Sequence, residues 1–176
     1  MTVSKAETLP NQVVTIEPLT AAAFASFGMV VAHASAARRH YFPEALEHSP
    51  EAAQASFWVS RVDAVTQLPL AVTMMERHPY TTQTFLPLRG GRYLAVVASS
   101  DQQGLPDLAT ARAFLVAGHQ GLTYHRDVWH CGMTVLDAPS EFAVLMHKTG
   151  RDDDDVFLEL PRPFSIEPPV VPDPGA

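Results

Sequence analysis

The stretch that decides the fold opens at residues 76–87 with ERHPYTTQTFLP and closes at residues 121–130 with GLTYHRDVWH. Both ends carry imidazole next to other polar groups. The side chains of a strand repeat with period two, so Glu76 and His78 are expected to point to one face and Arg77 to the other. The first segment therefore predicts a strand that delivers a carboxylate and an imidazole to the same place.

Two further polar side chains can reach that place. Gln83 follows a Pro-Tyr-Thr-Thr segment where the chain can bend back, and His125 comes from the second segment. Two groups one residue apart, a third a few residues on and a histidine from a later motif resemble the ligand layout of cupin barrels. That resemblance implies that Glu76, His78, Gln83 and His125 surround one divalent metal ion, with nickel, zinc and manganese not distinguishable. A metal-free network of the same residues is the alternative.

The amino-acid sequence of these motifs also resembles that of the ureidoglycolate lyase family, and the resemblance covers residues 13–150. The residues that carry this resemblance lie at 76–79, 83–87, 106–108, 112–114, 124–126 and 128–130. The resemblance implies cleavage of (S)-ureidoglycolate to glyoxylate and urea in the breakdown of purine-derived ureides, by a homodimer. The chain departs from the family pattern in three places: at residues 38–48, at Cys131 and at residues 147–148.

Composition limits the classes of function. With 176 residues, 47% of them hydrophobic and 18% charged, the chain suits one globular domain, and we interpret residues 1–176 as a single cupin-like domain. A formal net charge of -7 argues against a nucleic-acid partner. One cysteine permits no internal disulfide, and no signal peptide or membrane-spanning run is evident, so we expect a cytoplasmic protein.

Short strands separated by turns predict a mainly all-β fold, a cupin-type β-barrel or jelly roll with one or two short helices. We expect a short helix over residues 21–27, with Thr20 as its N-cap and Gly28 as its stop. Residues 45–55 can hold a helical turn, and residues 108–114 can be helical or irregular. The expected strands lie at 13–16, 29–31, 57–62, 69–75, 83–88, 92–98, 111–116, 133–136 and 142–146.

The two ends of the chain and one acidic run are expected to lie outside the barrel. We predict that residues 1–12 are flexible and that residues 161–176, which hold six of the fifteen prolines, form an extended or disordered arm. The four aspartates at 152–155 lack the spacing of an EF-hand, so we interpret them as a solvated turn.

The implied substrate is a hemiaminal, whose cleavage needs a base for the hydroxyl proton and an acid for the leaving nitrogen. Histidine suits both transfers near neutral pH. Our candidates for these proton transfers are His125, His78 and His130. The candidates for substrate binding are Arg77, Gln83, Tyr124 and Arg126; a guanidinium can clamp a carboxylate with two hydrogen bonds.

Two other functions remain open from the sequence. The departures from the family pattern are compatible with a cupin enzyme that acts on a related small 2-hydroxy acid. A non-catalytic module that binds a small carboxylate is the second alternative. A nucleophilic role for Cys131 is not among them, because no step of the cleavage needs a thiol, and we interpret this residue as a small buried hydrophobe.

Overall fold

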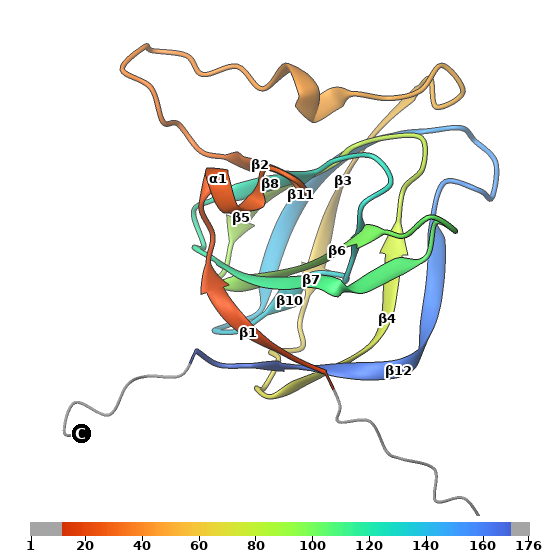
Figure 1. Cartoon of the computed structure of the whole chain (residues 1–176). Helices are drawn as coiled ribbons and strands as arrows, with labels where there is room; N and C mark the ends of the chain where they lie inside the picture. Colours follow the sequence, from red (N-terminus) through yellow and green to blue (C-terminus); the bar gives the residue numbers. More distant parts are fainter. Residues whose placement is uncertain (1–11, 170–176) are drawn as a thin grey trace, which may run out of the picture.

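The computed structural model describes residues 12–169, and their regular structure is almost entirely β (Figure 1). This confirms the predicted fold class. The elements are β1 Val13–Pro18, α1 Ala21–Phe24, β2 Gly28–Val31, η1 Pro43–Leu46, β3 Gln54–Val62, β4 Leu70–Arg77, β5 Gln83–Arg89, β6 Tyr93–Ser100, β7 Pro106–Val116, β8 Gly121–Tyr124, β9 Trp129–His130, β10 Thr134–Val135, β11 Ser140–Lys148 and β12 Val156–Glu167. Within the described part of the chain, no helix has the length and apolar character needed to cross a membrane.

Two sheets make up the barrel. One has seven strands in the order β10-β6-β7-β1-β12-β4-β9, and β9 also pairs with β6, so this sheet closes on itself. The other has five strands in the order β2-β8-β5-β11-β3. The two-residue strand β9 is thus the link that joins β4 to β6, and it places a motif residue at the closure point of the sheet.

Strand β6 separates two hydrophobic cores. Tyr93, Ala95 and Val97 point into the core shared with the five-stranded sheet, while the alternate residues, such as Leu94 and Val96, point into the core inside the closed sheet. All of these side chains are buried. A strand buried on both faces has a continuous run of apolar and aromatic residues, which is why residues 93–98 contain no charged residue.

The proline-rich tail does not begin where the sequence predicted. β12 runs through residues 161–167 as an inner strand, parallel to β1 and antiparallel to β4. Pro161 and Pro163 fall within the irregular stretch between Glu159 and Phe164, where the pairing to β4 shifts register. A bulge tolerates residues that lack an N–H donor, so prolines occur here inside a central strand. Residues 170–176 of the predicted arm lie outside the described residues.

The N-terminal prediction also needs a correction at its boundary. Gln12 is held in place, because its backbone carbonyl accepts a hydrogen bond from Ser165 N and its side-chain amide donates to Leu108 O. The rest of the predicted flexible segment, residues 1–11, lies outside the described residues.

The short helix has the predicted N-cap, but Gly28 does not end the helix as predicted. Thr20 Oγ1 accepts a hydrogen bond from Ala23 N, as expected of an N-cap. The helix already ends at Phe24, and Gly28 begins β2, where an added Cβ would lie 1.9 Å from Thr123 O. Gly28 therefore allows β2 to approach β8 closely.

Two local predictions were wrong. Residues 108–114 are neither helical nor irregular but part of the long strand β7, which pairs with both β6 and β1. The helical turn expected within residues 45–55 is a 3₁₀ turn that begins earlier, at Pro43, and its proline occupies the first turn, where no N–H donor is needed.

Candidate active site and metal centre

The site is assembled where β4 ends against β9. Glu76 on β4 pairs directly with His130 on β9, and opposed residues of an antiparallel pair point to the same face of a sheet. His78 follows two residues after Glu76 and reaches the same place from the end of β4. One ligand atom from each of Glu76, His78 and His130 lies within 4.8 Å of the others.

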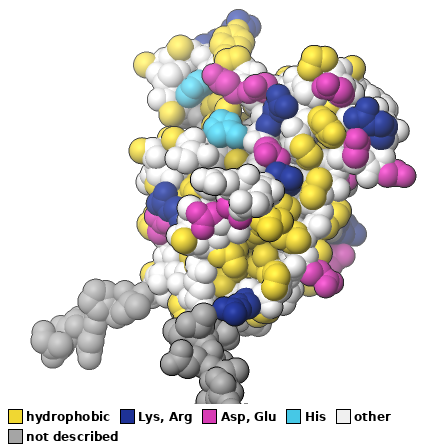
Figure 2. All heavy atoms as spheres, turned by 45° about the vertical axis from the view of Figure 1, so that its right-hand side comes forward, with side chains coloured by type: hydrophobic (Ala, Val, Ile, Leu, Met, Phe, Trp, Pro, Cys, Tyr) yellow, Lys and Arg dark blue, Asp and Glu magenta, His cyan; other side chains and the backbone are white. Residues whose placement is uncertain are grey.

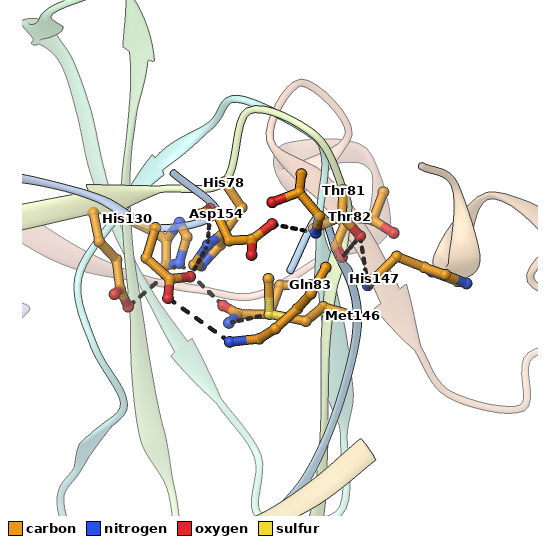
Figure 3. A network of polar contacts seen from close by, with 12 residues as sticks. His78, Thr81, Thr82, Gln83, His130, Met146, His147 and Asp154 are labelled. Atoms are coloured by element: carbon orange, nitrogen blue, oxygen red, sulfur yellow. Dashed lines mark hydrogen bonds and ion pairs between the residues drawn. The ribbon is translucent and has the colours of Figure 1, made fainter. Parts of the chain in front are cut away.

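His78 is oriented by a carboxylate that precedes β12. Its Nδ1 lies 2.9 Å from Asp155 Oδ1 and 3.4 Å from the carbonyl oxygen of Asp154 (Figure 3). Both partners accept hydrogen bonds, so Nδ1 carries the proton. The other nitrogen, Nε2, is buried and has no hydrogen-bond partner within the described structure. In the neutral ring it presents a lone pair to the site.

His130 presents its lone pair in the same way. Its Nδ1 lies 2.9 Å from the carbonyl oxygen of Val128 and donates to it. Burial, followed by the neighbouring His78, lowers the pKa of His130 to about 3, so the ring is neutral at physiological pH. Its Nε2 then lacks a proton and lies 3.6 Å from Glu76 Oε1.

Glu76 is the acidic member of the cluster. Burial raises the pKa of its carboxyl group, and the nearby Asp155 carboxylate adds to this rise, while His78 opposes it. A carboxyl group with a raised pKa can exchange a proton closer to neutral pH than an exposed glutamate can.

The donor set fits a divalent metal ion. Two imidazoles offer lone pairs, each with its other nitrogen fixed by an acceptor, and a carboxylate completes three ligands. The unpartnered Nε2 of His78 is the strongest sign, because a buried polar atom without a partner is costly unless something binds it. Glu76, His78 and His130 are therefore able to hold such an ion.

Glu76 and His78 line a pocket of about 350 Å³, while His130 is fully buried next to them. Gln83 borders it from β5, where its Oε1 lies 3.2 Å from His130 Nε2 (Figure 3). Both atoms are acceptors when Nδ1 of His130 carries the proton, and only a half-turn of the amide that exchanges Oε1 and Nε2 would let Gln83 donate to the ring. The remaining walls combine apolar and charged side chains: Trp58, Ser60, Arg61, Val62, Phe85, Met133, Met146, Lys148, Asp155 and Phe157.

The family model for ureidoglycolate lyase matches residues 11–167. The chain belongs to the ureidoglycolate lyase family. A putative ureidoglycolate lyase from Agrobacterium fabrum is 36% identical over 88% of this chain and 94% of its own length, and a ureidoglycolate lyase from Pseudomonas fluorescens SBW25 is 36% identical over 87% and 96%. Among solved structures, RmlC from Streptococcus suis aligns with a TM-score of 0.40 and 13% identity over 54% of this chain and 44% of that one.

Within this family fold, the structure does not bring His125 to the cluster. The backbone N–H of His125 donates to Phe27 O, and its ring lies 3.3 Å from Ala25 O, beside α1. The place predicted for His125 is occupied by His130, because β9 inserts between β4 and β6. The sequence contains no signal for this pairing, since β9 is only two residues long.

The predicted carboxylate clamps also lie elsewhere. Arg77 binds Asp127 Oδ1 at 2.8 Å and stacks over Trp129, on the face opposite to Glu76. The guanidinium of Arg126 is exposed and donates to Pro79 O. Tyr124 is buried beneath the site, where its ring stacks on His130 at a centroid distance of 4.1 Å. None of the three lines the pocket.

The acidic run is only partly the solvated turn that we predicted. Asp152 is exposed and Asp153 pairs with Arg151, as a surface turn requires. Asp154, however, is 5% exposed and accepts a hydrogen bond from Thr149 N, and Asp155 reaches His78. Sequence reasoning missed Asp155 because four adjacent aspartates give no indication of which one turns inward.

Cys131 is half-buried, and its thiol points toward Met74 O. Burial raises the pKa of this thiol to about 12, so it stays protonated. This agrees with its interpretation as a small hydrophobe.

Proposed function

We propose that this protein cleaves ureidoglycolate to glyoxylate and urea. The observation that carries the proposal is the cluster of Glu76, His78 and His130, two of which line one pocket, in a chain that belongs to the ureidoglycolate lyase family. The neighbouring polar groups suit a small and highly polar substrate.

The reaction needs no covalent intermediate. The hydroxyl group on the central carbon loses its proton, the oxygen forms the aldehyde C=O bond of glyoxylate, and the C–N bond breaks. The leaving nitrogen gains a proton and departs as urea. One proton leaves an oxygen and one arrives at a nitrogen on the same carbon, so a single group that exchanges a proton can serve both transfers.

Glu76 is our candidate for that group. Burial raises the pKa of its carboxyl group, and its carboxylate lies close to ring nitrogens of both His78 and His130. The lone pair of His130 can accept a hydrogen bond from the substrate, and Gln83 can bind the ureido group through its amide. His125 stays a candidate only for a role outside this pocket.

We propose in addition that this site can hold one divalent metal ion on Glu76, His78 and His130, in which case Glu76 and His130 act as ligands and not in the proton-exchanging and hydrogen-bonding roles described for the metal-free pocket. When bound, such an ion would polarise the substrate hydroxyl group and favour its ionisation. Asp155 and the carbonyl oxygen of Val128 keep both ring nitrogens in the orientation that ligation requires. The donor set suits nickel, zinc and manganese alike.

We further propose a cytoplasmic homodimer. The single cysteine is compatible with a reducing compartment. Figure 2 brings forward the side of the molecule that carries β4 and β12 and shows hydrophobic side chains gathered in the middle of that face, with charged groups around them. Met74 and Phe157 on these strands are about half exposed. Light scattering on the purified protein, compared with Met74→Glu, tests this arrangement.

The central experiment measures glyoxylate release from racemic ureidoglycolate, with chelated and metal-supplemented samples in parallel. We expect release from one enantiomer, with loss of activity on chelation and recovery with metal. A rate equal to the spontaneous one in every sample would refute the lyase proposal and favour a related 2-hydroxy acid or a binding role. Full activity in chelated protein that is verified to contain no metal would refute the metal proposal but not the lyase proposal.

A further inference from the structure

We propose that Lys148 binds the carboxylate of the substrate and thereby sets the preference for 2-hydroxy acids, an inference that rests on the proposed function. A substrate with a permanent negative charge needs a cationic partner in a partly enclosed pocket. Two basic side chains line this pocket, Arg61 and Lys148.

Arg61 is already neutralised at the rim. Its Nε and Nη2 atoms both donate to Glu141 Oε1, at 3.1 and 2.8 Å, and its side chain is 59% exposed. The two arginines of the motifs are also engaged elsewhere, Arg77 with Asp127 and Arg126 with Pro79 O. These contacts leave Lys148 as the basic group of the pocket with free hydrogen-bonding capacity.

The position of Lys148 follows from the alternation of β11. Phe142, Val144 and Met146 are buried toward the barrel interior, and Lys148 continues this series at the pocket mouth. Met146 lies at the pocket wall beside Gln83. The strand therefore leads from the apolar core to a charged group at the point where a substrate enters.

The Lys148 ammonium group is held in place, but its hydrogen-bond donors are not used. It lies 5.7 Å from the centroid of the Trp58 ring, which supports a cation through its π face. It forms a long ion pair with Asp155 Oδ2 at 3.9 Å, a distance that exceeds a hydrogen bond, and Nζ forms no hydrogen bond to any residue among 12–169. An ammonium group has three donors, so all remain available to an anion.

The same contacts connect Lys148 to the reacting groups. Asp155 lies between it and His78, with Oδ2 toward the ammonium group and Oδ1 toward Nδ1 of the ring. In a 2-hydroxy acid the carboxylate and the hydroxyl group sit on adjacent carbons. A carboxylate on Lys148 would therefore direct the neighbouring hydroxyl group toward Glu76 and the two imidazoles.

The test compares Lys148→Met, which keeps an apolar stem, with Lys148→Arg, which keeps the charge. Arg89→Met serves as the control, because Arg89 is an exposed arginine outside the pocket that also pairs with Glu141. For each protein we would measure KM and kcat with ureidoglycolate and titrate glyoxylate by calorimetry at fixed metal content. Metal affinity would be measured in parallel.

We expect Lys148→Met to raise KM and the Kd of glyoxylate by about 10- to 100-fold, the range of a hydrogen bond to a charged group. Lys148→Arg should restore most of the affinity, and Arg89→Met should behave like the wild type. The inference is overturned if Lys148→Met binds glyoxylate as tightly as the wild type. It is also overturned if the wild type binds no glyoxylate, or if Lys148→Arg fails to restore binding while metal affinity falls.

These outcomes separate the two proposals. If the wild type releases no glyoxylate from ureidoglycolate, the lyase proposal fails, yet the glyoxylate titration still tests Lys148. If the wild type is active and Lys148→Met keeps its KM, only the role of Lys148 is refuted.

Discussion

Replacing Asp155 with asparagine tests how far the site depends on the orientation of His78. The carboxylate lies 2.9 Å from Nδ1, a charge-assisted hydrogen bond that also lowers the pKa of Asp155. Asparagine keeps the shape but removes the charge, and its amide can present N–H to the ring and shift the ring proton to Nε2. Hydrogen bonds to charged groups exceed neutral ones by about 1 to 1.5 kcal/mol, and carboxylate partners of metal-bound histidines affect affinity by about 10- to 100-fold.

We therefore expect Asp155→Asn to lower metal affinity and kcat/KM by about 10- to 100-fold. The loss of folding stability should stay below about 1 kcal/mol, because the side chain is 37% exposed and its ion pair is screened by solvent. Calorimetric metal titration, steady-state kinetics and thermal unfolding measure the three quantities. The matched control is Asp152→Asn, an exposed member of the same run. Equal metal affinity and activity in both variants would refute the orienting role of Asp155.

Three further outcomes are expected. The pKa of His130 is about 3 in the native protein against 6.5 for an ordinary histidine, so between these values the unfolded chain binds more protons and stability falls as pH falls. Between pH 6.5 and pH 5 this group removes about 2 kcal/mol; urea unfolding should show a flatter profile for His130→Gln, whereas an unchanged slope would contradict the buried neutral ring. Phe24→Ala should cost about 3 to 5 kcal/mol in urea unfolding, because the ring is fully buried against Phe27, Phe114 and Tyr124. His125→Ala should retain most of the glyoxylate-forming activity, and its loss without unfolding would restore the original sequence-based hypothesis for this residue.

The sequence predicted those features that depend on short-range patterns. Period-two alternation predicted that Glu76 in β4 and His78 just after β4 point to one side, and the continuous apolar run of β6 predicted a strand at the correct position. The side chain of Thr20 and the residues after it specified the helix start. In each case the physical cause lies within a few residues of the feature it explains.

The prediction errors arise where the pairing register between distant strands determines which side chains reach the site. Whether His125 or His130 faces the cluster depends on how β9 pairs with β4 and β6. Both residues are histidines, so residue type does not distinguish them. Asp155 directly precedes β12, which begins at Val156. The prolines from Pro161 onward argued against a strand in this region, so the start of β12 was not predicted. Lys148 could have been found from the alternation of β11, since its spacing from Met146 places it on the inner face.

The position of β1 has a consequence for the order in which the chain can fold. β1 precedes every other described strand in the chain, yet Val13 pairs with Ser165 and Ile16 pairs with Ala113, so both neighbours of this strand come from the far half of the chain. Contacts of such long sequence separation form slowly, because the loop entropy is lost before any stabilising contact is gained. During synthesis the apolar side chains of β1 therefore have no neighbouring strand until β7 and then β12 have been made.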